Sequence, residues 1–192
     1  AEALYEGGAD FLEVCTFLRP FGFFVQSVNF NKHGWGDAIF LRHWWATDVP
    51  TRGVDVARGR PCRQSSLSPW SKAPDEASRA VAGRRTGGYA FHTGLEDRPW
   101  FEVDLGSVQS FDEILVFNRL DVPQRASRLA IELSDDGTAW SVVHRHEGLF
   151  GGIDGHPLRF TQPGMSARYV RIAAEQRTYL HLDAVEVYRF GD

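Results

Sequence analysis

Cysteine, lysine and long apolar runs are all scarce in this 192-residue chain. The two cysteines, Cys15 and Cys62, lie far apart, so we expect two free thiols, as in a reducing compartment, and a bacterial cytoplasmic location rather than secretion. No apolar run reaches the length of about 20 residues that crosses a bilayer. The formal net charge of −4 provides no basic field for nucleic acid or for an anionic membrane surface, and we expect neither as a partner.

The chain does have a globular composition, with 43% hydrophobic and 24% charged residues, and its character changes near residue 50. Apolar residues at helical spacing predict a helix over 9–20, and strands are predicted over 23–28 and 37–42. This short α/β segment, residues 1–48, is too small to fold alone and needs a partner surface. Residues 49–56 form a predicted linker.

From residue 57 to residue 192 the pattern is all-β. Short apolar runs are separated by turn-forming Asp-Gly, Gly-Gly and Pro-Gly pairs, which is typical of an antiparallel sandwich or barrel. The apolar faces of these strands should point inward, so we expect Trp100, Phe111 and Trp140 in the core. The predicted strands are Trp100–Leu105, Phe111–Asn118, Leu129–Ser134, Trp140–His144, Arg168–Ile172 and Leu182–Tyr188.

One imidazole and two guanidinium groups, those of His92, Arg119 and Arg125, are hard to explain as folding chemistry. Both arginines follow an apolar strand, where loops begin. A guanidinium has five N–H donors and no acceptor, which suits the lone pairs of sugar hydroxyls. These residues predict a site for a polyhydroxylated ligand; Arg119 as a mere surface salt-bridge partner of Asp121 is the structural alternative.

Aromatic residues accompany this predicted site. Trp70 lies in a loop between turn-forming residues, and Tyr89 and Phe91 are close to His92. Each could stack on the apolar face of a pyranose ring or fold back onto the sandwich. For His181, beside the last strand, structural packing is the favoured interpretation and an approach to the loop rim is the alternative. Trp44-Trp45 are expected to pack between the two units.

Residues 57–190 resemble the discoidin family, also called the coagulation-factor type C domain, and within it most closely the F-type (fucose-binding) lectins. The resemblance implies an all-β fold, an eight-stranded jelly-roll β-sandwich with a shallow site on loops at one end. It is carried by Ala57–Pro61, Gln64–Ser66, Ala80-Val81, Phe91–Thr93, Pro99–Gly106, Asn118–Asp121, Leu133–Trp140, Ala167–Arg171 and Val185–Tyr188.

The site of F-type lectins consists of a histidine, then an arginine and an aspartate separated by a single residue, and then a second basic residue. His92, Arg119 and Asp121 match this pattern, and the resemblance implies that Asp121 braces an arginine by a charge-assisted hydrogen bond. The second basic residue is either Arg125, one position early, or Arg128, three residues later. The sugar that the resemblance implies is fucose.

The calcium site of the family is depleted in this sequence. Ala82 replaces the aspartate of its usual Ala-Val-Asp-Gly, and Ala184 replaces a glutamate. Calcium takes six to eight oxygen ligands, so the loss of two carboxylates weakens such a site unless backbone carbonyls replace them. Bound calcium is therefore left open as a cofactor, with Asp183 as its candidate ligand.

The first 45 residues resemble the C-terminal end of FkbM-type methyltransferases, through Leu4–Gly7, Phe17-Leu18, Phe21–Phe23 and Gly36–Arg42. The resemblance implies that residues 1–48 are the remnant of a methyltransferase-like α/β domain, namely its last helix and closing β-pair. The glycine-rich turn that would hold the methyl donor is absent. We therefore expect no catalysis from this fragment.

The predicted function is non-catalytic binding of a carbohydrate, fucose or a related monosaccharide, by a lectin-like module attached to a glycan-modifying methyltransferase. The alternative is a protein-interaction module whose rim arginines meet acidic side chains. A membrane-surface module is a weaker alternative because of the negative net charge. Oligomerisation is left open.

Overall fold

The computed structural model describes residues 11–18, 23–30, 36–42, 53–152 and 156–191. In the N-terminal part, helix α1 (Phe11–Leu18) packs against the antiparallel pair β1 (Phe23–Phe30) and β2 (Gly36–Arg42). The predicted helix and both predicted strands of this segment are thus confirmed. The aromatic rings of Phe11 and Phe40 join the helix to the pair, with centroids 6.2 Å apart. Trp44 and Trp45 lie outside the described residues.

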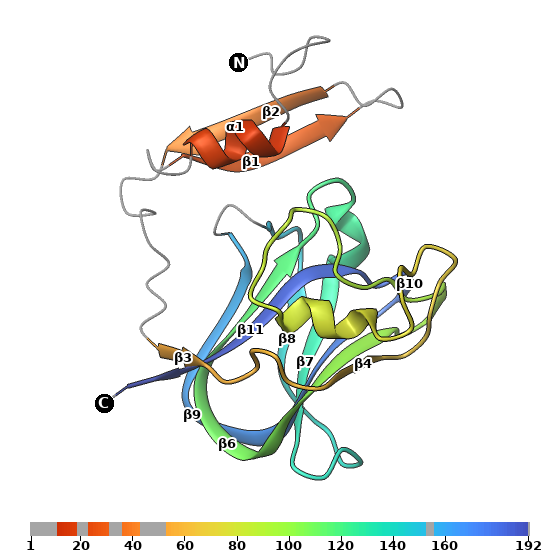
Figure 1. Ribbon diagram of the computed structural model, residues 1–192, viewed down its shortest axis with the longest axis vertical. Coiled ribbons are helices and arrows are strands. Elements are labelled where there is room, and N and C mark those ends of the chain that lie inside the picture. The colour runs from red at the N-terminus through yellow and green to blue at the C-terminus, as the bar shows by residue number, and fades with distance from the viewer. Residues whose placement is uncertain (1–10, 19–22, 31–35, 43–52, 153–155, 192) are drawn as a thin grey trace.

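The rest of the described chain is an antiparallel β-sandwich (Figure 1), as predicted. Its main sheet has the strand order β3-β11-β6-β9-β7-β8, with β4 paired to β6, and β5 pairs separately with β10. The described residues of this part contain nine strands, where the resemblance implied eight. The strands and 3₁₀ helices are β3 (Gly53–Asp55), β4 (Cys62–Gln64), η2 (Glu76–Val81), β5 (Glu96–Asp97), β6 (Trp100–Asn118), η3 (Pro123–Ala126), β7 (Arg128–Ser134), β8 (Ser141–Glu147), β9 (Leu158–Ala174), β10 (Arg177–Thr178) and β11 (Leu182–Phe190).

Two long bent strands, β6 and β9, form both layers of the sandwich. The predicted strands 100–105 and 111–118 are the two arms of β6, and β9 pairs with both arms. The register shifts between Asp104 and Gln109 and again between Phe111 and Glu113, so the ladder turns there instead of ending. Figure 1 shows β6 and β9 curving through one end of the sandwich. The loops at the other end carry the candidate site.

The predicted linker is partly wrong, because β3 lies within it and pairs with β11. The sandwich therefore includes Gly53 and does not begin at residue 57. Val56 and Ala57 are already buried in its core. Glycine is required at Gly53, since a Cβ there would lie 2.3 Å from the carbonyl oxygen of Arg189 on β11. Among the described residues, no helix is long and apolar enough to cross a membrane.

The core between the two layers is continuous and rich in phenylalanine and branched aliphatic residues. Phe111 is fully buried, as predicted, but the prediction for the two tryptophans is wrong. Trp100 and Trp140 are half-buried and hold the Arg171 guanidinium between them, with its carbon 4.6 Å and 3.6 Å from the two ring centroids. Their rings cover a charged side chain on the outer face of the sheet. Cys15 and Cys62 are free thiols, as expected.

Candidate functional site

His92 is the most tightly fixed residue at the loop end of the sandwich. Its backbone N–H donates to Glu76 on η2 (2.7 Å), and its carbonyl accepts from Gln64 (3.1 Å) and Ser71 (2.9 Å). The ring Nδ1 lies 2.8 Å from the carbonyl oxygen of Thr93. Because a carbonyl only accepts, Nδ1 carries the hydrogen in the neutral ring, and Nε2 is left as an acceptor.

The electrostatic surroundings of His92 keep this ring neutral. Burial is the largest cause that lowers its pKa, and the guanidinium groups of Arg125 and Arg119 lower it further, against the hydrogen bond to Thr93. In the neutral imidazole Nδ1 donates to the carbonyl of Thr93, so the ring presents one hydrogen-bond acceptor, at Nε2. It can accept a hydrogen bond from a ligand hydroxyl.

Arg119 and Asp121 form a two-pronged ion pair directly after β6. Nε and Nη2 of Arg119 donate to the two carboxylate oxygens of Asp121, so the pairing that the resemblance implied is present. Partial burial would raise the pKa of Asp121, but the Arg119 hydrogen bonds and charge bring it below the usual value. The Arg119 side chain is only 14% exposed, and its guanidinium carbon lies 5.0 Å from the ring centroid of Tyr89. The aspartate and the ring therefore fix the guanidinium in one orientation.

Arg125 is brought to the same rim by the short helix η3. Its Nη1 lies 3.4 Å from Nε2 of His181, and its guanidinium carbon lies 5.0 Å from the ring centroid of Tyr179. Arg128 instead pairs with Glu147 on the neighbouring strand, at 3.4 Å. Of the two basic residues considered for this position, the structure thus places Arg125 beside the histidines.

His181 also belongs to this group, which is the interpretation that the sequence favoured less. It is fully buried, and its ring centroid lies 5.1 Å from that of His92. Burial lowers its pKa to about 3, with further lowering by the charges of Arg119, His92 and Arg125. Its Nδ1 has no hydrogen-bond partner among the described residues. The ring is therefore neutral, and it lies behind His92 and beside Arg125.

Aromatic rings surround His92 on three sides. The ring centroids of Trp70, Tyr89 and Tyr179 lie 5.3, 5.4 and 5.5 Å from that of His92. Trp70 is 55% exposed, and the hydroxyl of Tyr89 donates to its backbone carbonyl (3.0 Å). Tyr179 was not singled out from the sequence; the alternation of Tyr179 and His181 before β11 is the signal that could have indicated it.

Phe91 is not part of the aromatic wall, and its prediction as a ligand-binding residue is wrong. Its side chain is fully buried and stacks on Phe101, with ring centroids 5.0 Å apart and planes 22° apart. Successive residues of an extended segment point to opposite sides, so Phe91 enters the core where His92 faces the rim. Phe91 therefore anchors the segment that carries His92 to the core of the sandwich.

Asp183 is also placed differently from its prediction as a calcium ligand. Its carboxylate accepts hydrogen bonds from the backbone N–H (2.7 Å) and hydroxyl (2.8 Å) of Thr86 and from the backbone N–H of Gly87 (2.8 Å). Within the described ranges, no group of three or more histidine, cysteine, aspartate or glutamate side chains could hold a metal ion. Asp183 thus fastens the loop that leads to Tyr89.

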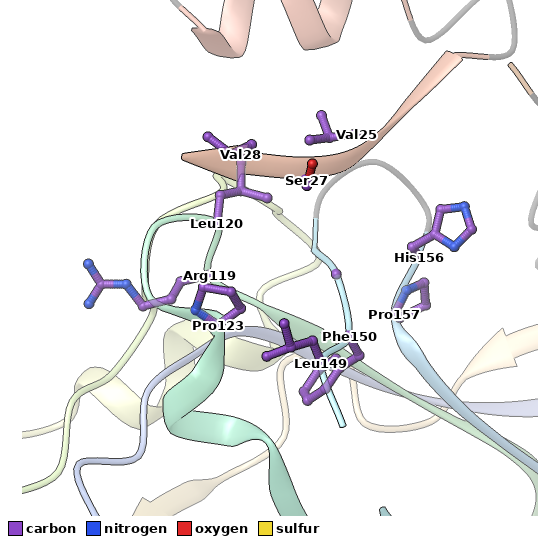
Figure 2. A pocket seen from close by; sticks show the side chains of 11 residues that line it. Val25, Ser27, Val28, Arg119, Leu120, Pro123, Leu149, Phe150, His156 and Pro157 are labelled. Carbon is purple, nitrogen blue, oxygen red and sulfur yellow. The ribbon is translucent and has the colours of Figure 1, made fainter. Parts of the chain in front are cut away.

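A cavity of about 460 Å³ lies beside the site, between β1 and the rim loops (Figure 2). Figure 2 shows β1 passing over Leu120, with Leu149 and Phe150 on the opposite side of the cavity. The side chain of Arg119 extends away from the other lining residues in this view. Arg119 therefore contributes its charged end to the candidate site and only its stem and backbone to the cavity.

The assembled site combines hydrogen-bond donors and an acceptor with the aromatic rings that lie around His92. Two fixed guanidinium groups can donate to ligand oxygens, and Nε2 of His92 can accept from a ligand hydroxyl. The exposed ring of Trp70 adds an apolar face at the edge. These donors, the acceptor and the aromatic rings are groups that can hold a polyhydroxylated ligand.

Comparisons with known proteins agree with this geometry. A family model described as a NedA-like, galactose-binding domain of the coagulation-factor F5/F8 type C group matches residues 79–172. No curated protein matches the chain significantly.

Solved structures of carbohydrate-binding domains are similar to the sandwich. The lectin domain of lectinolysin, complexed with Lewis B antigen, is 29% identical, with a TM-score of 0.59 over 72% of this chain and 98% of that chain. A fucose-binding module of Streptococcus pneumoniae is 26% identical, with a TM-score of 0.59 over 71% and 96% of the two chains. A fucolectin from striped bass serum (24% identity, TM-score 0.59, over 72% of this chain and 48% of that chain) shares the fold. The chain thus contains a discoidin-like β-sandwich that matches a galactose-binding, coagulation-factor type C family model and resembles fucose-binding lectins.

Proposed function

We propose that this module binds the non-reducing end of a glycan without catalysis, and that the sugar is fucose or a related monosaccharide. The observation that carries the proposal is the convergence of His92, Arg119 and Arg125 on one aromatic-lined rim. The likeness to fucose-binding structures supports the choice of sugar.

In the proposed mode of binding, each group has one role. Arg119, held by Asp121, donates to the ring oxygen and hydroxyl oxygens of the sugar, and Arg125 donates to further oxygen atoms of the same sugar. The neutral Nε2 of His92 accepts a hydrogen bond from one hydroxyl, and the ring of Trp70 covers the C–H face. In this mode these four side chains all bind the sugar, and none of them is required to attack it.

A shallow rim of this kind binds a single sugar weakly. We expect a dissociation constant on the order of 0.1–1 mM, or about 4–5.5 kcal/mol. Several copies on one surface, or several sugars on one glycan, would raise the apparent affinity through multivalency.

The test is a glycan screen followed by titration with L-fucose, in which the native chain is compared with Arg119→Ala and Asp121→Asn. We expect the alanine variant to lose binding and the asparagine variant to weaken it about tenfold, because a charge-assisted brace of the guanidinium is removed. Arg128→Ala is the matched control, since this arginine pairs with Glu147 away from the rim. Absence of any glycan signal from the native chain would overturn the proposal.

We further propose that the module is attached to a glycan-modifying methyltransferase. The support is the helix and closing β-pair of residues 11–42, where the sequence resembles the end of FkbM-type enzymes. Sequencing of the region upstream tests this proposal. A glycine-rich turn between a strand and a helix is expected there, and its absence would contradict the assignment.

A further inference from the structure

Six arginines of the described chain place a guanidinium over an aromatic ring, and five of them also have a carboxylate partner. The five pairs are Arg63–Glu102, Arg85–Glu186, Arg119–Asp121, Arg168–Asp104 and Arg171–Glu102. The pattern is independent of the strand or loop that carries the arginine. Five of the six stacked guanidinium groups thus have their positive charge compensated by an acid of the protein.

Arg125 is the exception. Its guanidinium lies over Tyr179 in the same way, yet no carboxylate forms a salt bridge with it among the described residues. Its single hydrogen-bonding contact with a side chain is the long one from Nη1 to His181 Nε2, at 3.4 Å. Most of the N–H donors of this half-buried guanidinium therefore have no acceptor among the described residues, and they lie on the rim where the proposed ligand binds.

The nearby acids do not compensate Arg125. Asp121 spends both oxygens on Arg119, and Glu76 is buried behind His92, where it accepts from the backbone N–H groups of His92 and Lys72. Lys72 adds a further positive charge, with its ammonium 4.4 Å from the ring centroid of Tyr89. The rim thus presents an uncompensated positive charge around neutral histidines.

We propose, on the basis of the carbohydrate-binding function proposed above, that the sugar bound here carries a negatively charged group, a carboxylate or a sulfate ester, which pairs with Arg125. A guanidinium fork matches a carboxylate in a two-pronged geometry, as Arg119 and Asp121 show in the same site. The ligand then supplies the acid that the chain supplies for the other stacked arginines. Lys72 attracts the anion without contacting it.

Two matched pairs of free sugars test this proposal with the full chain. D-galacturonate differs from D-galactose by a carboxylate, and sulfated L-fucose differs from L-fucose by a sulfate. We expect at least one anionic sugar to bind about tenfold more tightly than its neutral counterpart at low ionic strength. This preference should shrink when NaCl is raised from about 20 to about 500 mM, because salt screens exposed charges. The pair that shows the preference identifies the anion.

Variants of Arg125 separate the guanidinium fork from simple charge. Arg125→Gln should abolish the preference for the anion, and Arg125→Lys should retain only part of it because an ammonium lacks the fork. Arg79→Gln is the control, since it removes an equal charge from an exposed position on η2 that has no salt-bridge partner among the described residues. It should retain the native preference.

The outcomes distinguish this inference from the function on which it rests. Equal or tighter binding of the neutral sugar in both pairs would overturn the anionic ligand and leave the lectin function standing. A preference that survives in Arg125→Gln would also overturn it. If no sugar, neutral or anionic, bound the native chain at about 10 mM, beyond the weakest affinity expected of a shallow site, the lectin function itself would fail.

Discussion

His92 and His181 lie with their ring centroids 5.1 Å apart, and both are buried. Burial is the main cause that lowers the pKa of each imidazole, and the charges of Arg119 and Arg125 lower it further. The neutral state of the pair is thus a property of the folded site. It makes both stability and binding depend on pH.

We expect the free energy of unfolding to fall below about pH 6.5 because of His181. Its pKa is about 3 in the folded chain and near 6.5 when exposed, so the unfolded chain binds the proton more strongly. The stability is fully present above pH 6.5 and decreases as the pH falls toward 3, by about 2 kcal/mol at pH 5. Denaturant unfolding of the native chain and of His181→Leu at pH 8 and pH 5 measures this, and the variant should lose less than the native chain.

His146→Gln is the matched control for that experiment, because this histidine lies on β8 and contacts Phe150 and the carbonyl of Gly148, away from the site. It leaves His181 and its surroundings in place, so its pH dependence is the reference for that of His181→Leu. An unchanged pH dependence in His181→Leu would contradict the assignment of a buried, neutral His181.

Binding of L-fucose should decrease only at a pH below 6.5. Nε2 of His92 accepts a hydrogen bond only while the ring is neutral, and its pKa is lowered by burial and by Arg125 and Arg119. Protonation turns Nε2 into a donor, so the sugar hydroxyl can no longer donate to it, and it adds a positive charge beside the guanidinium groups of Arg119 and Arg125. The dissociation constant should therefore rise as the pH falls and should reach twice its value at pH 8 only below about pH 6.5. A doubling above pH 6.5 would show that His92 does not act as the acceptor.

The sequence predicted the strands whose apolar runs are short and buried. Strands β7 and β11 coincide with their predicted ranges to within two residues, because nearly all of their residues are buried. Strand β6 was predicted as two strands, since the segment Gly106–Ser110 has the composition of a turn. In the structure this segment bends but continues the ladder, because β9 bends alongside it. That pairing depends on residues about 60 positions away, which local pattern cannot reveal.

The candidate site was predictable to a similar extent. His92, Arg119 and Arg125 stand out because such residues at strand ends are not needed by the core. Tyr179 was missed and His181 was undervalued, because their proximity to Arg125 is created by the connection between β10 and β11, more than 50 residues later. The error at Phe91 has a local cause. Its neighbour faces the rim, so Phe91 itself must face inward.

Trp70 should contribute to binding but not to folding. Its ring is 55% exposed and lies 5.3 Å from that of His92, so Trp70→Ala should change the free energy of unfolding by less than about 0.5 kcal/mol. Loss of its contact with the sugar should weaken binding by about 0.5–1.5 kcal/mol, or about 2- to 10-fold. Denaturant unfolding measures the first effect, and calorimetric titration of both proteins measures the second. The native chain should also show a ligand-induced change in tryptophan fluorescence that the variant lacks. Val108→Ala, an equally exposed apolar position in the bend, is the control. An undiminished affinity in Trp70→Ala would place the sugar elsewhere on the rim.

Asp183 should stabilise the fold without calcium. It accepts two backbone N–H groups and one hydroxyl from Thr86 and Gly87, so the protein itself satisfies the carboxylate that the depleted family site would offer to a metal ion. Asp183→Asn turns an amide toward these donors and should cost about 1–3 kcal/mol of unfolding free energy, while Asp135→Asn in the exposed β7–β8 turn should cost little. Thermal unfolding with a chelator and with millimolar calcium should give the same midpoint. A midpoint that rises with calcium concentration would instead reveal a bound ion, because a ligand of the native state stabilises it in proportion to the logarithm of its concentration.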